Sequence, residues 1–328
     1  MAQDFKDSLS LWIEVKGISR KELIALLQNK YYEEFKGLDA ITLSRWLNGK
    51  STPPLYKQFY IAKCLDVSLK EHILSLDLSK MKYPTKYDTI FYNLTKVLDF
   101  SISVLSYRHV PKSVKSEISR DTFQEHVERF GGFYSDISAL KSFKNALYEM
   151  KSTINYKSIV LKNEEDEIIG HWSGIMDISS LNGMASFIPI PDDEIDRSCL
   201  VSLGYYVRSE HYFELIVQAI CLYLMSYAKT KDFIYFYNVD CRPIIEFCKF
   251  VFNAEEMRYY PPLDDKDKMG VYLLKFNIIK SIANPVILKR VQEKLNCLEE
   301  CGANNCQLCN LKEIEIRENN TYKINLEK

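Results

Sequence analysis

Four cysteines lie close together near the C-terminal end of the sequence: Cys297, Cys301, Cys306 and Cys309. They are separated by three, four and two residues, and the glycine and asparagines between them permit a turn. In a reducing compartment, thiols at such spacings are typical of a metal site. Zinc held by four thiolates is the first expectation. An iron–sulfur cluster uses the same ligands, and a thiol–disulfide switch is the third alternative.

The compartment follows from the composition and from the start of the chain. The 328 residues are 47% hydrophobic and 27% charged, which is ordinary for a folded protein that needs no membrane. The start "MAQDFKDSLS" is too polar for a signal peptide, and the longest apolar run, 215–228, is too short to span a bilayer. We therefore expect a cytoplasmic protein with reduced cysteines. Five further cysteines lie singly among apolar neighbours and are predicted to be buried: Cys64, Cys199, Cys221, Cys241 and Cys248.

The second stretch whose residue types suggest a binding function is "LSRWLNGKSTPP", residues 43–54. Asp39 is a good N-cap for a short helix over 40–48, and the Asn-Gly pair ends that helix. Apolar residues at helical spacing predict an inner face made of Ile41, Leu43, Trp46 and Leu47. The other face is polar and carries Arg45, a residue type that reads guanine bidentately. The net charge of the chain is −1, so any nucleic-acid surface has to be local.

Four more short helices are predicted around this one, and together they cover residues 1–78. The strings "SRKELIALL", "LDAITLSRWLNGKSTPP" and "IAKCLDVSL" resemble the lambda repressor/Cro-type helix-turn-helix family. In that family the third helix lies in the major groove. The resemblance implies contacts to bases from Ala40, Ile41, Thr42, Ser44 and Arg45, and contacts to the DNA backbone from Arg20, Asn48, Lys50 and Ser51, with Arg20 alternatively touching an outer base. Backbone amides near Gly49 also suit phosphate. The segment "QNKYYEEFKGL" makes the turn longer than usual, so either the second helix continues or an extra loop is present.

Residues 79–282 change in character along their length. Helical patterns predominate to about residue 150, with a break expected at Gly131-Gly132. A hairpin over 157–178, strands over 199–207, 232–240 and 270–278, and helices over 211–230 and 242–257 then predict an α/β layer. This order is similar to that of the GNAT acetyltransferase superfamily. The family implies a glycine-rich pyrophosphate loop before the first of those helices. The segment "YYVRSEHYFE" has no glycine, which argues against acetyl-CoA binding.

The sequence thus predicts an α+β multidomain chain. Its parts are a helix-turn-helix domain over 1–78, a helical segment plus GNAT-like domain over 79–282, and a cysteine tail over 283–328. The leading interpretation is a homodimeric transcription regulator that binds a double-stranded DNA operator, with no catalytic residues. Its α/β domain would sense a small molecule or protein ligand, or dimerise. Two alternatives stay open: an active GNAT-type acyltransferase fused to a helix-turn-helix, and a protein-binding antirepressor.

Overall fold

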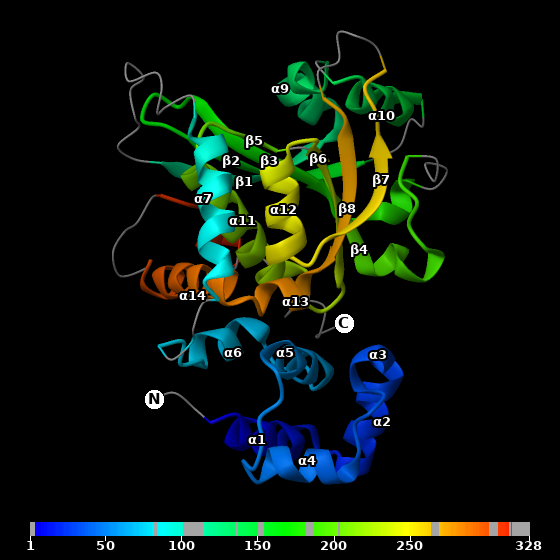
Figure 1. Ribbon diagram of the computed structural model, residues 1–328, viewed down its shortest axis with the longest axis vertical. Coiled ribbons are helices and arrows are strands. Elements are labelled where there is room, and N and C mark those ends of the chain that lie inside the picture. The colour runs from blue at the N-terminus through cyan, green and yellow to red at the C-terminus, as the bar shows by residue number, and fades with distance from the viewer. Residues whose placement is uncertain are drawn as a thin grey trace.

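The computed structural model describes residues 4–79, 81, 84–100, 114–135, 137–149, 154–181, 187–202, 204–263, 269–301, 308–314 and 316. Along the chain, a group of short helices precedes a layer of helices and strands built on one sheet (Figure 1). The mixed α/β character expected from the sequence is confirmed. No helix among the described residues is both long enough and apolar enough to cross a bilayer.

The first six helices form what we call the helical bundle: α1 (Phe5–Lys16), α2 (Arg20–Lys30), α3 (Tyr32–Phe35), α4 (Ala40–Leu47), α5 (Leu55–Cys64) and α6 (Leu69–Ser75). Ser19 and Glu22 form a capping box at the start of α2. Asp39 caps α4 by accepting a hydrogen bond from the Thr42 amide at 2.7 Å. The long turn between α2 and α4 contains the separate short helix α3, so the second helix does not continue through it.

One sheet organises the rest of the chain. Its strands are β1 (Lys115–Thr122), β2 (Asn155–Lys162), β3 (Ile168–Ile175), β4 (Ser198–Val201), β5 (Tyr205–Tyr206), β6 (Phe233–Val239), β7 (Glu255–Tyr260) and β8 (Val271–Asn277). Their order is β1-β2-β3-β4-β6-β8-β7, and β5 pairs with β3. All paired strands are antiparallel except β4 and β6, which are parallel. The predicted hairpin is β2–β3, and the alternation of strands and helices that suggested the GNAT superfamily follows it.

Helices cover both faces of the sheet (Figure 1). On one face lie α7 (Lys86–Leu98), α11 (Ser209–Ser226) and α12 (Arg242–Val251), whose apolar side chains share a core with Ile159 and Leu161 of β2. On the other face lie α9 (Phe123–Ser135) and α10 (Ser138–Glu149), where Phe143 and Leu147 pack with Tyr235 of β6. The short 3-10 helices η1 (Ile178–Leu181) and η2 (Asp192–Arg197) connect β3 to β4.

Several sequence predictions about this part are wrong. Residues 120–122 were expected to be helical but belong to β1, and residues 255–257 belong to β7 rather than to the helix before it. Helix α9 continues through Gly131 and Gly132, where a break was expected. The strand over 199–207 is divided into β4 and β5. Residues 101–110, which belong to the stretch with helical patterns, lie outside the described residues.

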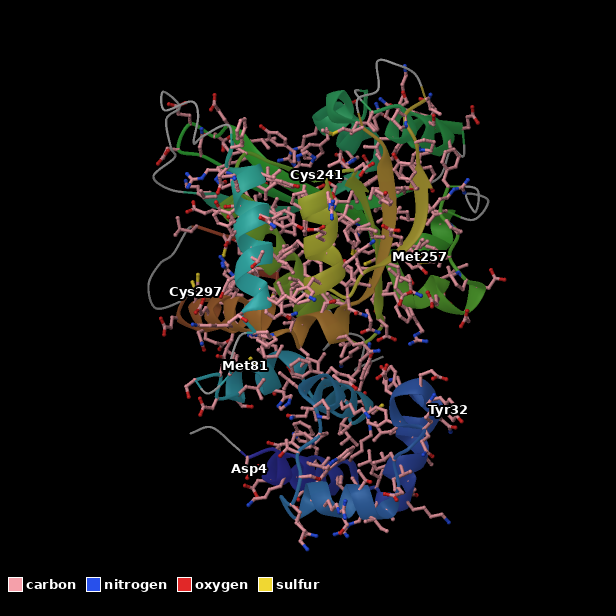
Figure 2. All side chains as sticks on the ribbon, in the orientation of Figure 1. Asp4, Tyr32, Met81, Cys241, Met257 and Cys297 are labelled. Atoms are coloured by element: carbon pink, nitrogen blue, oxygen red, sulfur yellow. The ribbon has the colours of Figure 1, made fainter. Side chains whose placement is uncertain are left out.

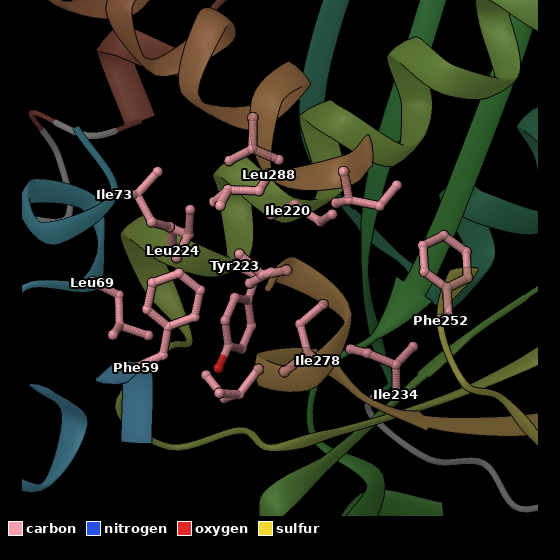
Figure 3. Close-up of a cluster of buried hydrophobic side chains, with 14 of the residues drawn as sticks. Phe59, Leu69, Ile73, Ile220, Tyr223, Leu224, Ile234, Phe252, Ile278 and Leu288 are labelled. Carbon is pink, nitrogen blue, oxygen red and sulfur yellow. The ribbon is translucent and has the colours of Figure 1, made fainter. Parts of the chain in front are cut away.

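The apolar core does not stop at the end of the helical bundle. Helices α13 (Ile278–Ile282) and α14 (Pro285–Glu300) lie between the bundle and the sheet (Figure 1). Phe59, Leu69 and Ile73 of α5 and α6 belong to the same buried cluster as Leu224 of α11 and Leu288 of α14 (Figure 3). Helix α14 therefore packs between the other two parts. The division at residue 283 stays a prediction.

Candidate functional site

The exposed side of α4 is the first candidate surface. Figure 1 places α4 at the end of the molecule farthest from the sheet. Leu43 and Trp46 are buried, as predicted, and Leu47 is half-buried. Ile41 is 65% exposed, so the prediction that it belongs to the inner, apolar face of α4 is wrong. Its exposure agrees with the other expectation, that it lies on the outer face. The remaining predicted contact residues are exposed or half-buried: Arg20, Ala40, Thr42, Ser44, Arg45, Asn48, Lys50 and Ser51.

The cations of this surface are free to meet an anion. Arg20, Arg45 and Lys50 make no ion pair within the part of the chain that the structure describes. The Lys6 side chain of α1 also passes beside Gly49 at the end of α4, but its ammonium is paired with Asp4 at 3.7 Å. The acidic residue closest in sequence, Asp39, is engaged as the N-cap, and this hydrogen bond to the Thr42 amide lowers the pKa of its carboxyl. The surface is therefore locally basic although the chain is not.

The backbone at the end of α4 is not available for phosphate as the sequence suggested. Gly49 has φ 67°, the left-handed conformation expected of a helix-ending glycine. Its amide donates to Trp46 O at 3.1 Å, the Lys50 amide donates to Arg45 O at 2.9 Å, and the Ser51 amide donates to Arg45 O at 3.4 Å. Because these amides are satisfied within the turn, contacts to a nucleic-acid backbone would come from side chains.

The second candidate site is a cleft between β4 and β6. The two strands pair in parallel only from Ser198↔Phe233 to Val201↔Phe236, and β6 then continues to Val239 without this partner. A cavity of about 260 Å³ opens where the strands part. Its walls are aromatic and aliphatic, with Ser202 and Asn238 as polar groups, and no charged side chain among the described residues lines it. Such a cavity suits an apolar or aromatic small molecule, or the apolar part of a larger one.

Close contact between Gly204 and Trp172 shapes this cleft. A Cβ atom on Gly204 would lie 1.8 Å from the Trp172 Nε1 atom, so only glycine allows the indole to take this position. The Trp172 ring also packs edge-on against Tyr212 of α11, with ring centroids 5.8 Å apart. All three residues line the cleft. The sequence predicted Gly204 inside a strand over 199–207 but carries no signal for its partner Trp172, which lies on β3.

The start of α11, where the GNAT resemblance implies a pyrophosphate, is already occupied by a carboxylate of this chain. Asp99, at the end of α7, accepts hydrogen bonds from the Ser209 amide at 2.7 Å and from the Ser209 hydroxyl at 2.6 Å. The neighbouring Arg208 pairs with Glu210. An acidic group at a helix N-terminus is electrostatically favourable, and here it takes the place of an external anion. Sequence reasoning missed Asp99 because it lies far from Ser209 along the chain.

Three of the four clustered cysteines are described. Cys297 is exposed on α14 (Figure 2), Cys301 is buried at the end of that helix, and Cys309 is half-buried where its backbone bridges Ser116 of β1. Cys306 lies outside the described residues. Among the residues that are described, no group of three or more metal-ligating side chains is assembled. The four-thiol cluster therefore stays a prediction.

The scattered cysteines have the properties of core residues. Cys64, Cys199, Cys221 and Cys248 are buried, as predicted, and Cys241 is half-buried. Burial raises the pKa of the thiols of Cys199, Cys221 and Cys248 to about 12, so they are protonated at neutral pH and unreactive.

Comparisons with known proteins find only solved structures with low TM-scores. No family model and no curated protein matches the sequence. Among solved structures, the spermidine N-acetyltransferase of Vibrio cholerae in complex with CoA and spermine is 13% identical, with a TM-score of 0.29, over 50% of this chain and 98% of its own. NAA60 of Arabidopsis thaliana in complex with acetyl-CoA is 14% identical, with a TM-score of 0.30, over 49% of this chain and 98% of its own. TM-scores of this size establish no family, and the sheet order above stands on its own.

Proposed function

We propose that this chain is a sequence-specific DNA-binding regulator whose α/β layer binds a small molecule in the cleft between β4 and β6. The observation that carries the DNA-binding part is the outer face of α4. Arg45 and Lys50 are exposed there without an ion-pair partner among the described residues, beside short polar side chains that can contact base edges. Figure 1 also places α4 at the end of the molecule away from the sheet, and a helix enters the major groove in proteins of this type.

Selection of DNA fragments from a random pool by the full chain, followed by mobility-shift titration, tests this part. The double variant Arg45→Ala/Lys50→Ala should lose binding. Lys141→Ala/Lys289→Ala removes the same charge from exposed positions of α10 and α14 and is the matched control. If the two double variants bind alike, attraction is only global and the proposal about α4 fails. Capture of a protein partner without any DNA shift would favour the antirepressor alternative.

A second candidate function, acyl transfer, is favoured by the cleft itself, which opens between two parallel strands beside α11. Acetyl-CoA would place its phosphates at the start of α11. The Asp99 carboxylate at Ser209 and the absence of glycine from residues 205–209 oppose this occupant. We therefore propose ligand sensing without catalysis. Calorimetry with acetyl-CoA separates the two: saturable binding at micromolar concentration would support the enzyme.

Two further parts of the proposal concern assembly and the cysteine tail. One helix of this kind reads about half a site, so we propose that the chain acts as a homodimer on a palindromic operator. Light scattering of the free and DNA-bound protein tests this. We also propose that Cys297, Cys301, Cys306 and Cys309 hold zinc, with an iron–sulfur cluster or a redox switch as the alternatives.

A further inference from the structure

A buried ion network joins the helical bundle to the sheet. The Lys63 ammonium of α5 lies 2.5 Å from the Asp232 carboxylate and also donates to Lys231 O at 3.1 Å. Both side chains of this pair are only 4% exposed. The second oxygen of Asp232 accepts from Arg197, whose Nε lies at 2.7 Å and whose terminal nitrogen lies at 2.6 Å. One carboxylate therefore holds a cation from each side of the boundary.

The two sheet residues of this network stand at the closed end of the cleft. Arg197 directly precedes β4, and Asp232 directly precedes β6. Their backbones are also linked, because the Asp232 amide donates to Arg197 O at 2.7 Å. Beyond this point the two strands pair as far as Val201↔Phe236 and then part around the cavity. A molecule that widened the cleft would have to pivot β4 and β6 about the Arg197–Asp232 link.

Asp232 is tied into the bundle through a short path to α4. Lys63 belongs to α5, whose first turn follows Pro53 and Pro54 at the end of the α4 turn. The Gln58 side chain of α5 donates to Pro53 O at 2.9 Å and fixes that connection. A buried charge that loses its partner is strongly destabilising. If Asp232 shifts, Lys63 therefore has to shift with it or move out of the interface into water.

We infer that the Lys63–Asp232–Arg197 network couples occupancy of the β4–β6 cleft to the docking of the helical bundle, and hence to the placement of α4. The inference rests on the proposed function for its biological meaning. Filling the cleft turns β6 at Asp232, weakens the contact with Lys63 and loosens α5. The coupling is reciprocal, so release of the bundle also eases entry to the cleft.

The chain offers matched controls for this network. Lys70 of α6 pairs with Glu299 of α14 at 2.5 Å, and Gln292 of α14 donates to Ile73 O and Leu76 O at 2.8 Å. These contacts also fasten the bundle, but they reach α14 rather than β4 or β6. Loss of the Lys70–Glu299 pair should weaken docking without breaking the proposed coupling.

The experiment fills the cleft without needing its ligand. Ala219 of α11 lines the cavity, and Ala219→Phe places a ring inside it. Amide hydrogen exchange is then measured on the full chain, with α10 as an internal reference for global opening. We expect Ala219→Phe to raise exchange in α5 by about fivefold or more, the lower end of couplings between sites. The increase should persist in Lys70→Met and disappear in Lys63→Met/Asp232→Leu, which replaces the buried pair by apolar groups.

Unchanged α5 exchange in Ala219→Phe would overturn the inference, and so would an equal increase in Lys63→Met/Asp232→Leu. If that double variant does not fold, Arg197→Gln provides the same test. Its side chain is 40% exposed, and its removal leaves Lys63 paired while it breaks the side-chain link between the strands. The backbone hydrogen bond from the Asp232 amide to Arg197 O remains. The Ala219→Phe effect should shrink in this variant, and an undiminished effect counts against the network. These measurements use no DNA, so they can support or contradict the coupling whether or not the chain binds an operator.

Discussion

The Trp172 indole fills the space in which any side chain on Gly204 would begin. A Cβ there would lie 1.8 Å from the indole nitrogen. Gly204→Ala should therefore displace Trp172 and cost about 1–3 kcal/mol of unfolding free energy, the usual range for overpacking. Urea unfolding and tryptophan emission measure the two effects.

The matched control is Gly132→Ala in α9, where an added Cβ meets nothing within 4 Å. Within a helix that change should stabilise by roughly 0.5–1 kcal/mol. Equal stabilities of the two variants would contradict the contact.

Asp99 is expected to act as a cap from outside the helix that it caps. Asp99→Ala removes two hydrogen bonds at Ser209 and should destabilise the protein by about 0.5–2 kcal/mol. Asn93→Ala, at an exposed position of α7, tests for effects of α7 itself and should change little. Hydrogen exchange at the Ser209 amide should accelerate in Asp99→Ala alone. If acetyl-CoA binds only after this substitution, Asp99 excludes the cofactor. If it binds the unaltered chain equally well, the carboxylate is no obstacle.

The two exposed cations of α4 and its turn should differ in their effect on DNA. Arg45→Ala should relax base preference at one position by roughly 1–3 kcal/mol, if it reads a guanine. Lys50→Ala should weaken binding to all sequences evenly and reduce the salt dependence by about one phosphate contact. Affinities for a panel of single-base operator variants at two salt concentrations measure both effects. An Arg45→Ala protein with unchanged base preference would show that α4 docks differently.

The features that could be predicted from the sequence are those determined by residues close together along the chain. The caps at Ser19 and Asp39 are set within a few residues, so the helices of the bundle were predicted nearly in place. Strand β7 was missed because "EEM" favours helix, and only pairing with β8 makes it a strand. Ile41 fits a helical apolar pattern, yet it is 65% exposed and none of the described residues buries it. The cleft and the contacts of Asp99 and Asp232 join segments far apart in the sequence, and no local pattern encodes them.

His72 should make the helical bundle sensitive to acid. It is 5% exposed between Trp12 and Phe59, and neither ring nitrogen has a hydrogen-bond partner within the described residues. Burial lowers its pKa from 6.5 to about 4. Between these pH values the unfolded chain binds the proton and the folded chain does not, so stability falls as the pH drops through this window. The slope from one such histidine is about 1.4 kcal/mol per pH unit.

His72→Phe should remove that part of the slope. It should also leave stability near neutral pH equal or higher, because two unsatisfied buried nitrogens are replaced by carbon. Urea unfolding at several pH values down to about 4.5 measures the difference. His126 and His171 have pKa values lowered to about 3 by burial, so they keep a residual slope in both proteins. Parallel curves for the wild type and His72→Phe would contradict a neutral His72 in the folded state.

The cysteine tail yields a prediction that does not depend on DNA binding. If the four thiolates hold a metal, Cys309→Ser should release it and free the segment around residue 309 from β1. There the Ser116 amide donates to Leu308 O at 2.8 Å, and the Asn310 side chain bonds both the amide and the carbonyl of Ile118. Cys241→Ser, at the half-buried cysteine that directly precedes α12, is the control and should keep the metal. Metal analysis and the visible spectrum of protein purified without oxygen or chelator distinguish zinc from an iron–sulfur cluster. Protein that lacks both metals while its thiols pair on oxidation would leave the redox switch as the remaining alternative.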